Sequence, residues 1–460
     1  MLRVVQAFDR SFIEEVATQG AADLERMLAA AHAAFKDRTG WLKPHRRLAV
    51  LERLVDLMAP RIDELALLIA REGGKPLTDA RTEALRALDG VKDAIAHLRT
   101  DAGTEVPMGL SPAADGRWAF TIREPIGVVA AISAFNHPLN LIVHQVVPAI
   151  AVGCPVIVKP ASATPLSCRE LVRMVHEAGL PEAWCQMFLP DGNELAEALV
   201  TDPRIAFFSF IGSARVGWSL QRKLAPGTRS ALEHGGVAPL IVDRSADLDR
   251  VIEPLAKGGY YHAGQVCVST QRIYVHRDLK DALVERFTKR VAALRVGDAI
   301  LAETEVGPLI QPREVERVGS WIDEAVAAGA GLLVGGERLS ETTYAPTILD
   351  EPPAVARVST EEVFGPLTCI YGFDDLGEAI ARANSLPVAF QSAIFSQDID
   401  TALKAALEFD ASAVLINDHT AFRVDWMPFA GRRVSGYGIG GIPYTMHDMT
   451  QEKMIVLRRG

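Results

Sequence analysis

The sequence has few of the features that mark membrane, nucleic-acid-binding or disulfide-rich proteins. Its 5 cysteines among 460 residues are scattered, and none lie at metal-ligand spacing, which indicates free thiols, a reducing compartment and no metal site. The net charge of −10 disfavours nucleic acid and anionic membranes as partners. Because Asp9, Glu14 and Glu15 interrupt the apolar residues of the N-terminus, we expect no signal peptide and a cytoplasmic protein.

Long hydrophobic runs are also missing. The longest apolar stretch, Leu139 to Val158, is broken by five residues, namely His144, Gln145, Pro148, Gly153 and Pro155. A membrane-spanning helix needs about 20 predominantly apolar residues, so we expect a buried helix followed by a strand, and no membrane contact. A hydrophobic content of 49% over 460 residues is typical of a globular protein with two or three domains.

The periodicity of the apolar residues changes along the chain. The first hundred residues predict helices, at Ala21–Asp37, Arg46–Arg71 and Thr78–Leu98. After a β-prone segment at Arg117–Glu124, short apolar strands alternate with helices, and a second such series begins near Leu240 and ends near Ala413. This pattern predicts an α/β fold whose parallel sheets are covered on both faces. The β-prone tail, Glu452–Arg459, would need another element or another subunit to pair with.

Polar residues follow three of the predicted strands, where open α/β sheets bind ligands. Asn136 could donate its amide to an oxyanion, Lys159 could bind ribose hydroxyls or phosphate, and Gly212–Ser213 could hold a pyrophosphate at a helix N-terminus. Taken singly, each is more typical of a turn residue, a solvated lysine or a helix cap.

A thiol and an acid suggest covalent chemistry on a carbonyl. Cys267 lies in Gly-Gln-Val-Cys, and Glu233 precedes Gly235 and Gly236, which indicates close approach of the backbone to another group. Glu362 precedes an aromatic residue and a Gly-Pro turn, so it could hold a ribose. A packed core thiol, a structural carboxylate and a charged loop are the alternatives.

The order and spacing of these segments resemble the aldehyde dehydrogenase superfamily, nearest its lactaldehyde and phosphonoacetaldehyde dehydrogenase branch. The matching segments are Gly74–Pro76, Phe135–Pro138, Val158–Pro160, Ile211–Ser213, Leu232–Gly236, Gly264–Cys267, Glu362–Pro366 and Pro428–Gly431. The resemblance implies an α/β fold of two doubly wound parallel-sheet domains with a small β oligomerisation extension. The implied parts are a cofactor domain at 1–106 and 126–232, an oligomerisation segment at 107–125, a catalytic domain at 233–433 and a C-terminal oligomerisation strand at 443–460.

The same resemblance implies an enzyme that oxidises an aldehyde to a carboxylic acid with NAD or NADP. Cys267 would be the nucleophile that forms a thiohemiacetal and then a thioester, Asn136 an oxyanion donor, and Glu233 the base that activates water for hydrolysis. The implied cofactor residues are Lys159, Ser162, Gly212, Ser213, Glu362 and Phe364. The implied assembly is a homodimer or homotetramer.

Several residues depart from the family pattern. Many relatives that prefer NAD carry Glu where this chain has Ser162, so acceptance of NADP is expected because no acid repels a 2′-phosphate. His234 follows the acid and could shift its pKa, although it can equally face away. Ala430 replaces a glycine of the usual Pro-Phe-Gly-Gly.

The substrate is expected to be a small polar or anionic aldehyde. Arg423 could clamp an anionic group, or it could form a structural pair with Asp425. Phe135, Trp426 and Phe429 would form an aromatic entry tunnel. Two other functions remain open: an enzyme that transfers the acyl group to CoA, which generally lacks the acid, and a catalytically silent homologue.

Overall fold

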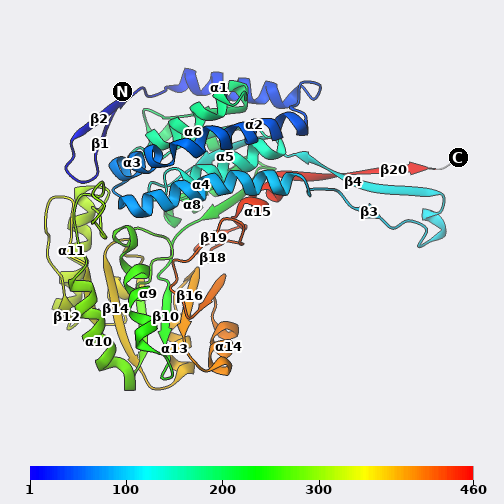
Figure 1. The fold of residues 1–460 in the computed structure, drawn as a ribbon. Coiled ribbons are helices and arrows are strands. Elements are labelled where there is room, and N and C mark those ends of the chain that lie inside the picture. The colour runs from blue at the N-terminus through cyan, green and yellow to red at the C-terminus, as the bar shows by residue number, and fades with distance from the viewer. Residues whose placement is uncertain (459–460) are drawn as a thin grey trace.

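The computed structural model describes residues 1–458 and consists of two α/β lobes and a projecting β extension (Figure 1). The first lobe is built on a six-stranded sheet with the order β19-β9-β8-β5-β6-β7. Its strands are β5 (Val128–Ile132), β6 (Val156–Lys159), β7 (Cys185–Met187), β8 (Ile205–Ile211), β9 (Arg229–Glu233) and β19 (Gly436–Tyr437). All neighbours are parallel except β19, which pairs antiparallel with β9.

Helices cover both faces of this sheet, as the near-continuous apolar strands predict. Successive residues of β5 alternate between two cores: Val129 and Ala131 face one, while Val128 and Ala130 face the other. The first core includes α2 (Pro44–Met58), α3 (Ile62–Gly73), α4 (Leu77–Leu98), α5 (Asn140–Val152), α6 (Leu166–Glu177) and α15 (Ile442–Asp448). The second includes α1 (Ala21–Lys36), α7 (Asn193–Thr201) and α8 (Ala214–Gln221).

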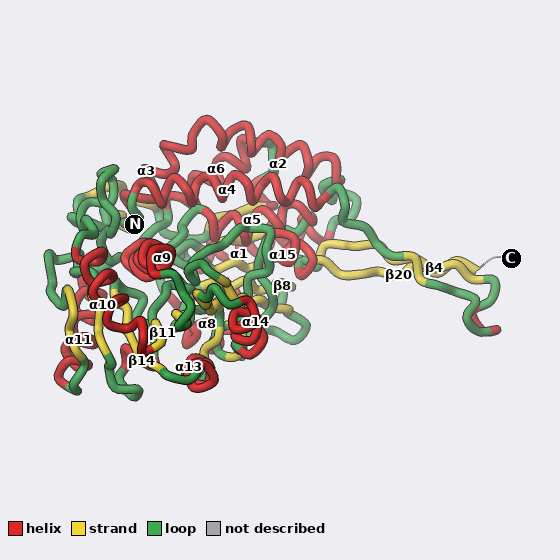
Figure 2. The backbone as a smooth tube through the Cα atoms, turned by 60° about the horizontal axis from the view of Figure 1, so that its bottom comes forward, coloured by secondary structure: helices red, strands yellow, loops and turns green. Residues whose placement is uncertain are grey.

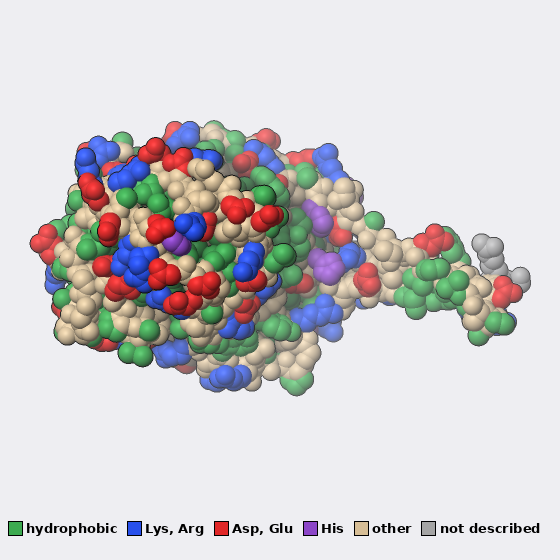
Figure 3. Space-filling model, turned by 90° about the horizontal axis from the view of Figure 1, so that it is seen from below, with side chains coloured by type: hydrophobic (Ala, Val, Ile, Leu, Met, Phe, Trp, Pro, Cys, Tyr) green, Lys and Arg blue, Asp and Glu red, His purple; other side chains and the backbone are tan. Residues whose placement is uncertain are grey.

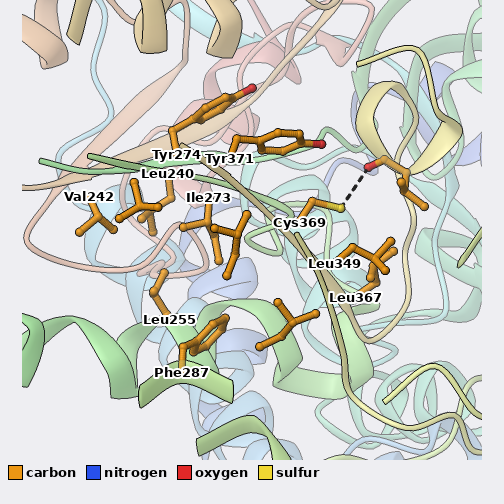
Figure 4. Packing of buried hydrophobic residues seen from close by; sticks show 14 of the residues in the cluster. Leu240, Val242, Leu255, Ile273, Tyr274, Phe287, Leu349, Leu367, Cys369 and Tyr371 are labelled. Atoms are coloured by element: carbon orange, nitrogen blue, oxygen red, sulfur yellow. Dashed lines mark hydrogen bonds between the residues drawn. The ribbon is translucent and has the colours of Figure 1, made fainter. Parts of the chain in front are cut away.

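The second lobe is built on a seven-stranded sheet with the order β12-β13-β14-β11-β10-β16-β17. Its strands are β10 (Pro239–Val242), β11 (Arg272–His276), β12 (Gly331–Val334), β13 (Thr347–Asp350), β14 (Leu367–Phe373), β16 (Gln391–Phe395) and β17 (Ala413–Ile416). Its helices are α9 (Leu248–Tyr260), α10 (Arg277–Ala292), α11 (Pro312–Ala327), α12 (Arg357–Thr360), α13 (Leu376–Ala383) and α14 (Ile399–Glu408). Side chains of the central strands pack against α9 and α10, for example Ile273 with Leu255 and Phe287 (Figure 4).

The β extension projects away from both lobes. It contains β3 (Glu105–Val106), β4 (Arg117–Pro125) and β20 (Thr450–Arg458), and β20 pairs antiparallel with the whole of β4. Both views of the backbone show this sheet extending beyond the helices (Figures 1 and 2). The β-prone tail predicted from the sequence therefore finds a partner strand within its own chain.

Two local features differ from the sequence-based expectation. The predicted helix at Arg46–Arg71 is divided into α2 and α3 by a short 3-10 turn at Ala59–Arg61, because Pro60 cannot donate the hydrogen bond that would continue α2. An N-terminal hairpin, β1 (Leu2–Val5) and β2 (Phe12–Val16), stands where helices alone were expected. The remaining short strands are β15 (Val388–Ala389) and β18 (Arg432–Arg433). Among residues 1–458, no helix is long and apolar enough to cross a membrane.

Candidate active site between the two sheets

One cavity of about 670 Å³ gathers most of the residues predicted from the sequence. This volume lies within the range of small-molecule sites. Twelve of the thirteen predicted site residues line it, namely Phe135, Asn136, Lys159, Ser162, Gly212, Ser213, Glu233, Cys267, Glu362, Phe364, Arg423 and Phe429. Trp426 does not line it and is 57% exposed, so its placement in an aromatic tunnel was wrong for this structure. Trp426 has turned to solvent because the neighbouring Asp425 points into the protein.

The parallel topology explains why residues far apart in the sequence meet here. β5, β6, β8 and β9 are parallel neighbours, so the segments that follow them leave the same edge of the sheet. Asn136 and Ser213 follow β5 and β8, while Lys159 and Glu233 are the last residues of β6 and β9.

A strained loop presents Cys267 to the cavity. Three consecutive residues before it, His262, Ala263 and Gly264, have φ values of +50°, +54° and +69°. At Gly264 a Cβ would overlap with the carbonyl of Gly365, so only glycine allows this close approach. Such strain persists only where the surroundings impose it, and it is common at functional sites.

Cys267 and Glu233 are in direct contact. The thiol Sγ lies 3.8 Å from Glu233 Oε1 and donates a hydrogen bond toward it. Burial raises the pKa of Cys267 well above the usual thiol range, and the nearby Glu233 carboxylate raises it further. Burial also raises the pKa of Glu233, an effect that Arg423 and the thiol partly offset. Ionisation of the thiol therefore requires a nearby base, and Glu233 is in place to serve as one.

Asn136 is held beside the cysteine loop. Its side-chain Nδ2 donates to the carbonyl of Gln265 at 3.0 Å, which leaves its second N–H available to another acceptor. Gln265 is fully buried and in turn fixes the loop, since it donates to Pro308 O at 3.1 Å and accepts from Ile310 N at 2.9 Å.

A buried ion pair supports the segment that carries Asn136. Glu83 Oε1 accepts the backbone N–H groups of Leu139 and Asn140 at 3.0 and 3.1 Å, at the start of α5. Its other oxygen contacts Lys75, and Lys75 also contacts His137 Nδ1 at 2.8 Å. A carboxylate near a helix N-terminus is favoured by the helix dipole, and removing one partner of such a buried pair costs about 3–5 kcal/mol.

The part of the cavity predicted to hold a dinucleotide has the groups that such a ligand needs. Glu362 Oε1 is buried without a partner among residues 1–458, and burial raises the pKa of this carboxyl to about 8. The Glu362 carboxylate lies against Gly235, where a Cβ would overlap with it, so a side chain at that position would displace the carboxylate. Lys159 Nζ contacts only its neighbour's carbonyl, Pro160 O, at 3.3 Å. Ser213 precedes α8 without capping it through its hydroxyl. These polar groups have hydrogen-bonding capacity that the protein does not use, and they fit a ligand rich in hydroxyls and anionic oxygens.

Arg423 does not pair directly with Asp425. The Asp425 carboxylate accepts from Arg86 at 2.8 and 2.9 Å, from Asn140 Nδ2 at 3.0 Å and from His144 Nε2 at 2.7 Å. Because Nε2 of His144 must then carry its proton, Nδ1 is the acceptor that Arg423 contacts at 3.4 Å. Burial lowers the pKa of His144 to about 4, which keeps it neutral. Arg423 and Asp425 are therefore linked through hydrogen bonds to the two ring nitrogens of His144, and not by a direct ion pair.

The guanidinium of Arg423 lines the cavity with part of its hydrogen-bonding capacity unused. Its Cζ lies 3.6 Å from the centre of the Phe429 ring, and its Nε has no partner among the described residues. Asp425 was considered from the sequence only as a partner of Arg423, and Arg86 and His144 were not assigned to the site, because they lie on distant segments without a shared local motif. His234 faces away from Glu233, since its Nδ1 contacts Gly212 O at 2.8 Å and its ring fills the space at Gly217.

Comparison with known proteins agrees with this geometry. The aldehyde dehydrogenase family profile matches residues 1–455. The 3-sulfolactaldehyde dehydrogenase of Priestia megaterium is 36% identical over 456 residues, which cover 99% of this chain and 94% of that protein.

Two solved structures are similar over the whole chain. Aldehyde dehydrogenase 21 from Physcomitrella patens, in complex with the reaction product succinate, has a TM-score of 0.94 and 34% identity, and the match covers 100% of this chain and 95% of that one. Glyceraldehyde-3-phosphate dehydrogenase from Methanocaldococcus jannaschii, complexed with NADP, has a TM-score of 0.94 and 32% identity, with coverage of 100% and 99%. The two sheets, the shared cavity and these likenesses lead to one conclusion: the chain belongs to the aldehyde dehydrogenase family and is an NAD(P)-dependent aldehyde dehydrogenase.

Proposed function

We propose that Cys267 and Glu233 carry out the oxidation, with Asn136 as the oxyanion donor. The observation that carries this proposal is the 3.8 Å contact between the thiol and the Glu233 carboxylate on the wall of the cavity. Glu233 takes the thiol proton as the sulfur attacks the aldehyde carbon, and the free N–H of Asn136 Nδ2 donates to the oxygen that becomes negative. A nicotinamide bound in the cavity would accept the hydride, which would leave a thioester on Cys267.

Glu233 then acts a second time, as the base for hydrolysis. Once its first proton has left, its carboxylate takes a proton from water as the water oxygen attacks the thioester carbon. The raised pKa of Glu233 suits this role, because a carboxyl with an ordinary pKa is a weak base near neutral pH. The carboxylate product and the free thiol complete the reaction.

The residues that would hold NAD or NADP are Lys159, Ser162, Gly212, Ser213, Glu362 and Phe364. Glu362 and Lys159 offer an acceptor and a donor to ribose hydroxyls, and Gly212 and Ser213 lie at the N-terminal end of α8, which suits a pyrophosphate. Phe364 packs edge-on against Phe135, with the ring centres 5.8 Å apart, so it would form a wall beside the nicotinamide. The exposed Ser162 brings no negative charge to this end of the cavity.

The substrate is proposed to be a small aldehyde with an anionic group. Arg423 supports this choice, because it borders the cavity as a cation and the Asp425 carboxylate near it is already bound by Arg86, Asn140 and His144. The likeness to a 3-sulfolactaldehyde dehydrogenase and to an enzyme that binds succinate points to the same class, since both molecules are anionic.

The extension is proposed to join subunits into a dimer or tetramer. Its sheet exposes large apolar side chains, namely Trp118, Met454, Val456 and Leu457, each at least 45% exposed. Figure 3 shows apolar side chains gathered on the projecting part of the surface. A three-stranded sheet without a core beneath it has little stability alone, and β20 leaves one edge unpaired.

The variant Glu233→Gln should form the first equivalent of NAD(P)H more slowly, because the thiol loses its base, and should then stall. Glutamine cannot take a proton from water, so hydrolysis should slow by a factor of about 100 or more, the range of general-base catalysis. In the wild-type enzyme, hydrolysis should fall as the pH drops through the raised pKa of Glu233, and the variant should lose this dependence. Stopped-flow measurement of NAD(P)H checks both. Turnover that depends on added CoA would contradict the hydrolytic route.

Wild-type enzyme should accept NADP as well as NAD. The variant Ser162→Glu should lower kcat/KM for NADP by about tenfold or more, because a carboxylate repels the 2′-phosphate, and should change the value for NAD much less. Ser162→Ala is the matched control and should leave the ratio nearly unchanged. A preference of the wild-type enzyme for NAD by a factor of a hundred or more would refute the expectation.

The variant Arg423→Ala should discriminate between charged and neutral substrates. A charge-assisted hydrogen bond contributes about 1.5–3 kcal/mol, so kcat/KM for succinic semialdehyde should fall by about tenfold to a hundredfold. Butyraldehyde, a neutral aldehyde of the same chain length, should be affected far less. Arg432→Ala, on the exposed β18, is the control and should affect neither. Equal losses on both aldehydes would reject the clamp.

Charged substitutions on the β extension should weaken the association of subunits without destabilising the two lobes. The double variant Met454→Asp and Val456→Asp should shift the enzyme to a smaller species in sedimentation velocity, because buried carboxylates are costly at an apolar interface. Leu407→Asp, on α14 and 86% exposed, serves as the control. An unchanged sedimentation coefficient for the double variant would rule out this surface.

A further inference from the structure

The turn of the N-terminal hairpin connects the two lobes. It joins β1 to β2, and the hairpin lies beside α3 and reaches toward α11 of the second lobe (Figure 1). In this turn the buried Ala7 donates its backbone N–H to Arg71 O of α3, at 3.0 Å. The hydroxyl of Thr342, which lies between β12 and β13, donates to Phe8 O in the same turn. None of the roles assigned to the cavity uses this hairpin.

Backbone segments of both lobes pack closely against this turn. At Gly74, just after α3, a Cβ would lie 2.7 Å from Pro308 Cγ and 3.0 Å from Ala7 Cβ. Gly74 also has a φ of +71°, so both its conformation and the lack of space favour glycine. At Gly307, a Cβ would overlap with Gly74 O. The turn, the end of α3 and the segment that contains Pro308 therefore have fixed positions relative to one another.

Arg10, in the same turn, contacts the wall of the cavity. Its guanidinium Nη1 donates to Ile310 O at 3.2 Å, and this is the only hydrogen bond of the Arg10 side chain among residues 1–458. Ile310 is one of the residues that line the cavity. The backbone of Arg10 has a φ of +60°, which is unfavourable for a residue with a Cβ. The turn therefore holds a strained conformation in which the guanidinium reaches the cavity wall.

Hydrogen bonds connect Ile310 to the proposed oxyanion donor. Ile310 N donates to Gln265 Oε1 at 2.9 Å. Gln265 Nε2 donates to Pro308 O at 3.1 Å, so both ends of this amide are held by the segment that Arg10 contacts. Gln265 O in turn accepts from Asn136 Nδ2 at 3.0 Å. Because Gln265 and Ile310 are buried, water would not replace a bond that is lost here.

We propose that Arg10 is a positioning residue for Asn136 and acts on it through Ile310 and Gln265. This rests on the proposed role of Asn136 as the oxyanion donor. A donor stabilises a developing negative charge best when it already points toward it, because no free energy is then spent on reorientation during the reaction. Arg10 does not line the cavity, so its effect falls on the step in which the oxyanion forms and not on the binding of aldehyde or cofactor.

The variant Arg10→Gly tests this role without forcing the turn to change, because glycine adopts a positive φ without strain. Formation of the first equivalent of NAD(P)H, followed by stopped flow, should slow by about twofold to tenfold, the range that corresponds to one lost hydrogen bond. The KM values for aldehyde and NAD(P) should stay within about twofold of wild type. Arg10→Lys should restore most of the rate, because its ammonium group can donate to the same carbonyl.

A double variant separates positioning from a general structural effect. Once Asn136 is replaced by Ala, Arg10→Gly should slow the first equivalent of NAD(P)H no further, because the residue on which Arg10 acts is gone. A general loosening of the lobes would instead slow the reaction by the same factor with and without Asn136. The cycle therefore reports the coupling of the two residues directly.

The matched control is Arg433→Gly, because Arg433 also has a positive φ, +54°, but pairs with Asp410 and does not line the cavity. It should leave the first turnover unchanged, and thermal unfolding midpoints should confirm that all variants fold. A wild-type rate in Arg10→Gly, or an equal loss in both backgrounds, would overturn the proposal. Failure of the oxyanion role itself is distinguishable, since Asn136→Ala alone would then keep the wild-type rate.

Discussion

The contact between a buried thiol and a buried carboxylate is the constraint on which the site depends. Neither Cys267 nor Glu233 ionises readily alone, because the low-dielectric surroundings raise both pKa values. Placing them 3.8 Å apart gives the thiol proton a destination and makes ionisation of the sulfur depend on the acid. The acid must then lose that proton before it can act as the base for hydrolysis.

The surrounding structure keeps this contact in place with buried charges rather than apolar packing alone. Glu83 receives the first N–H groups of α5 and holds Lys75, which fixes the segment bearing Asn136. Asp425 is bound by Arg86 and His144, which leaves Arg423 turned to the cavity. Buried carboxylates of this kind are stable only when every oxygen is satisfied, and both meet that condition. The same chemistry that stabilises the fold therefore positions the reacting groups.

The sequence indicates the site residues that lie near the carboxyl ends of strands, but few of the residues that hold them in place. Asn136, Lys159 and Ser213 stand out because the carboxyl ends of parallel strands meet at one edge, but only the family resemblance gave them and Glu233 their roles. Trp426 could not be placed, because the direction of a loop side chain depends on tertiary contacts such as that of Asp425 with Arg86, 339 residues away in the chain. The division of one predicted helix at Pro60, by contrast, has a local cause.

The central claim is that a covalent acyl group forms on Cys267 and that Glu233 is needed to remove it. The most direct measurement is the intact mass of Glu233→Gln after prolonged reaction with aldehyde and NAD(P), long enough for slow attack by the thiol, followed by mapping of the modified peptide. The account predicts a mass increase equal to one acyl group on the peptide that contains Cys267, and none when Cys267 is also replaced by Ala. An unmodified chain, or an acyl group on one of the four other cysteines, would contradict it.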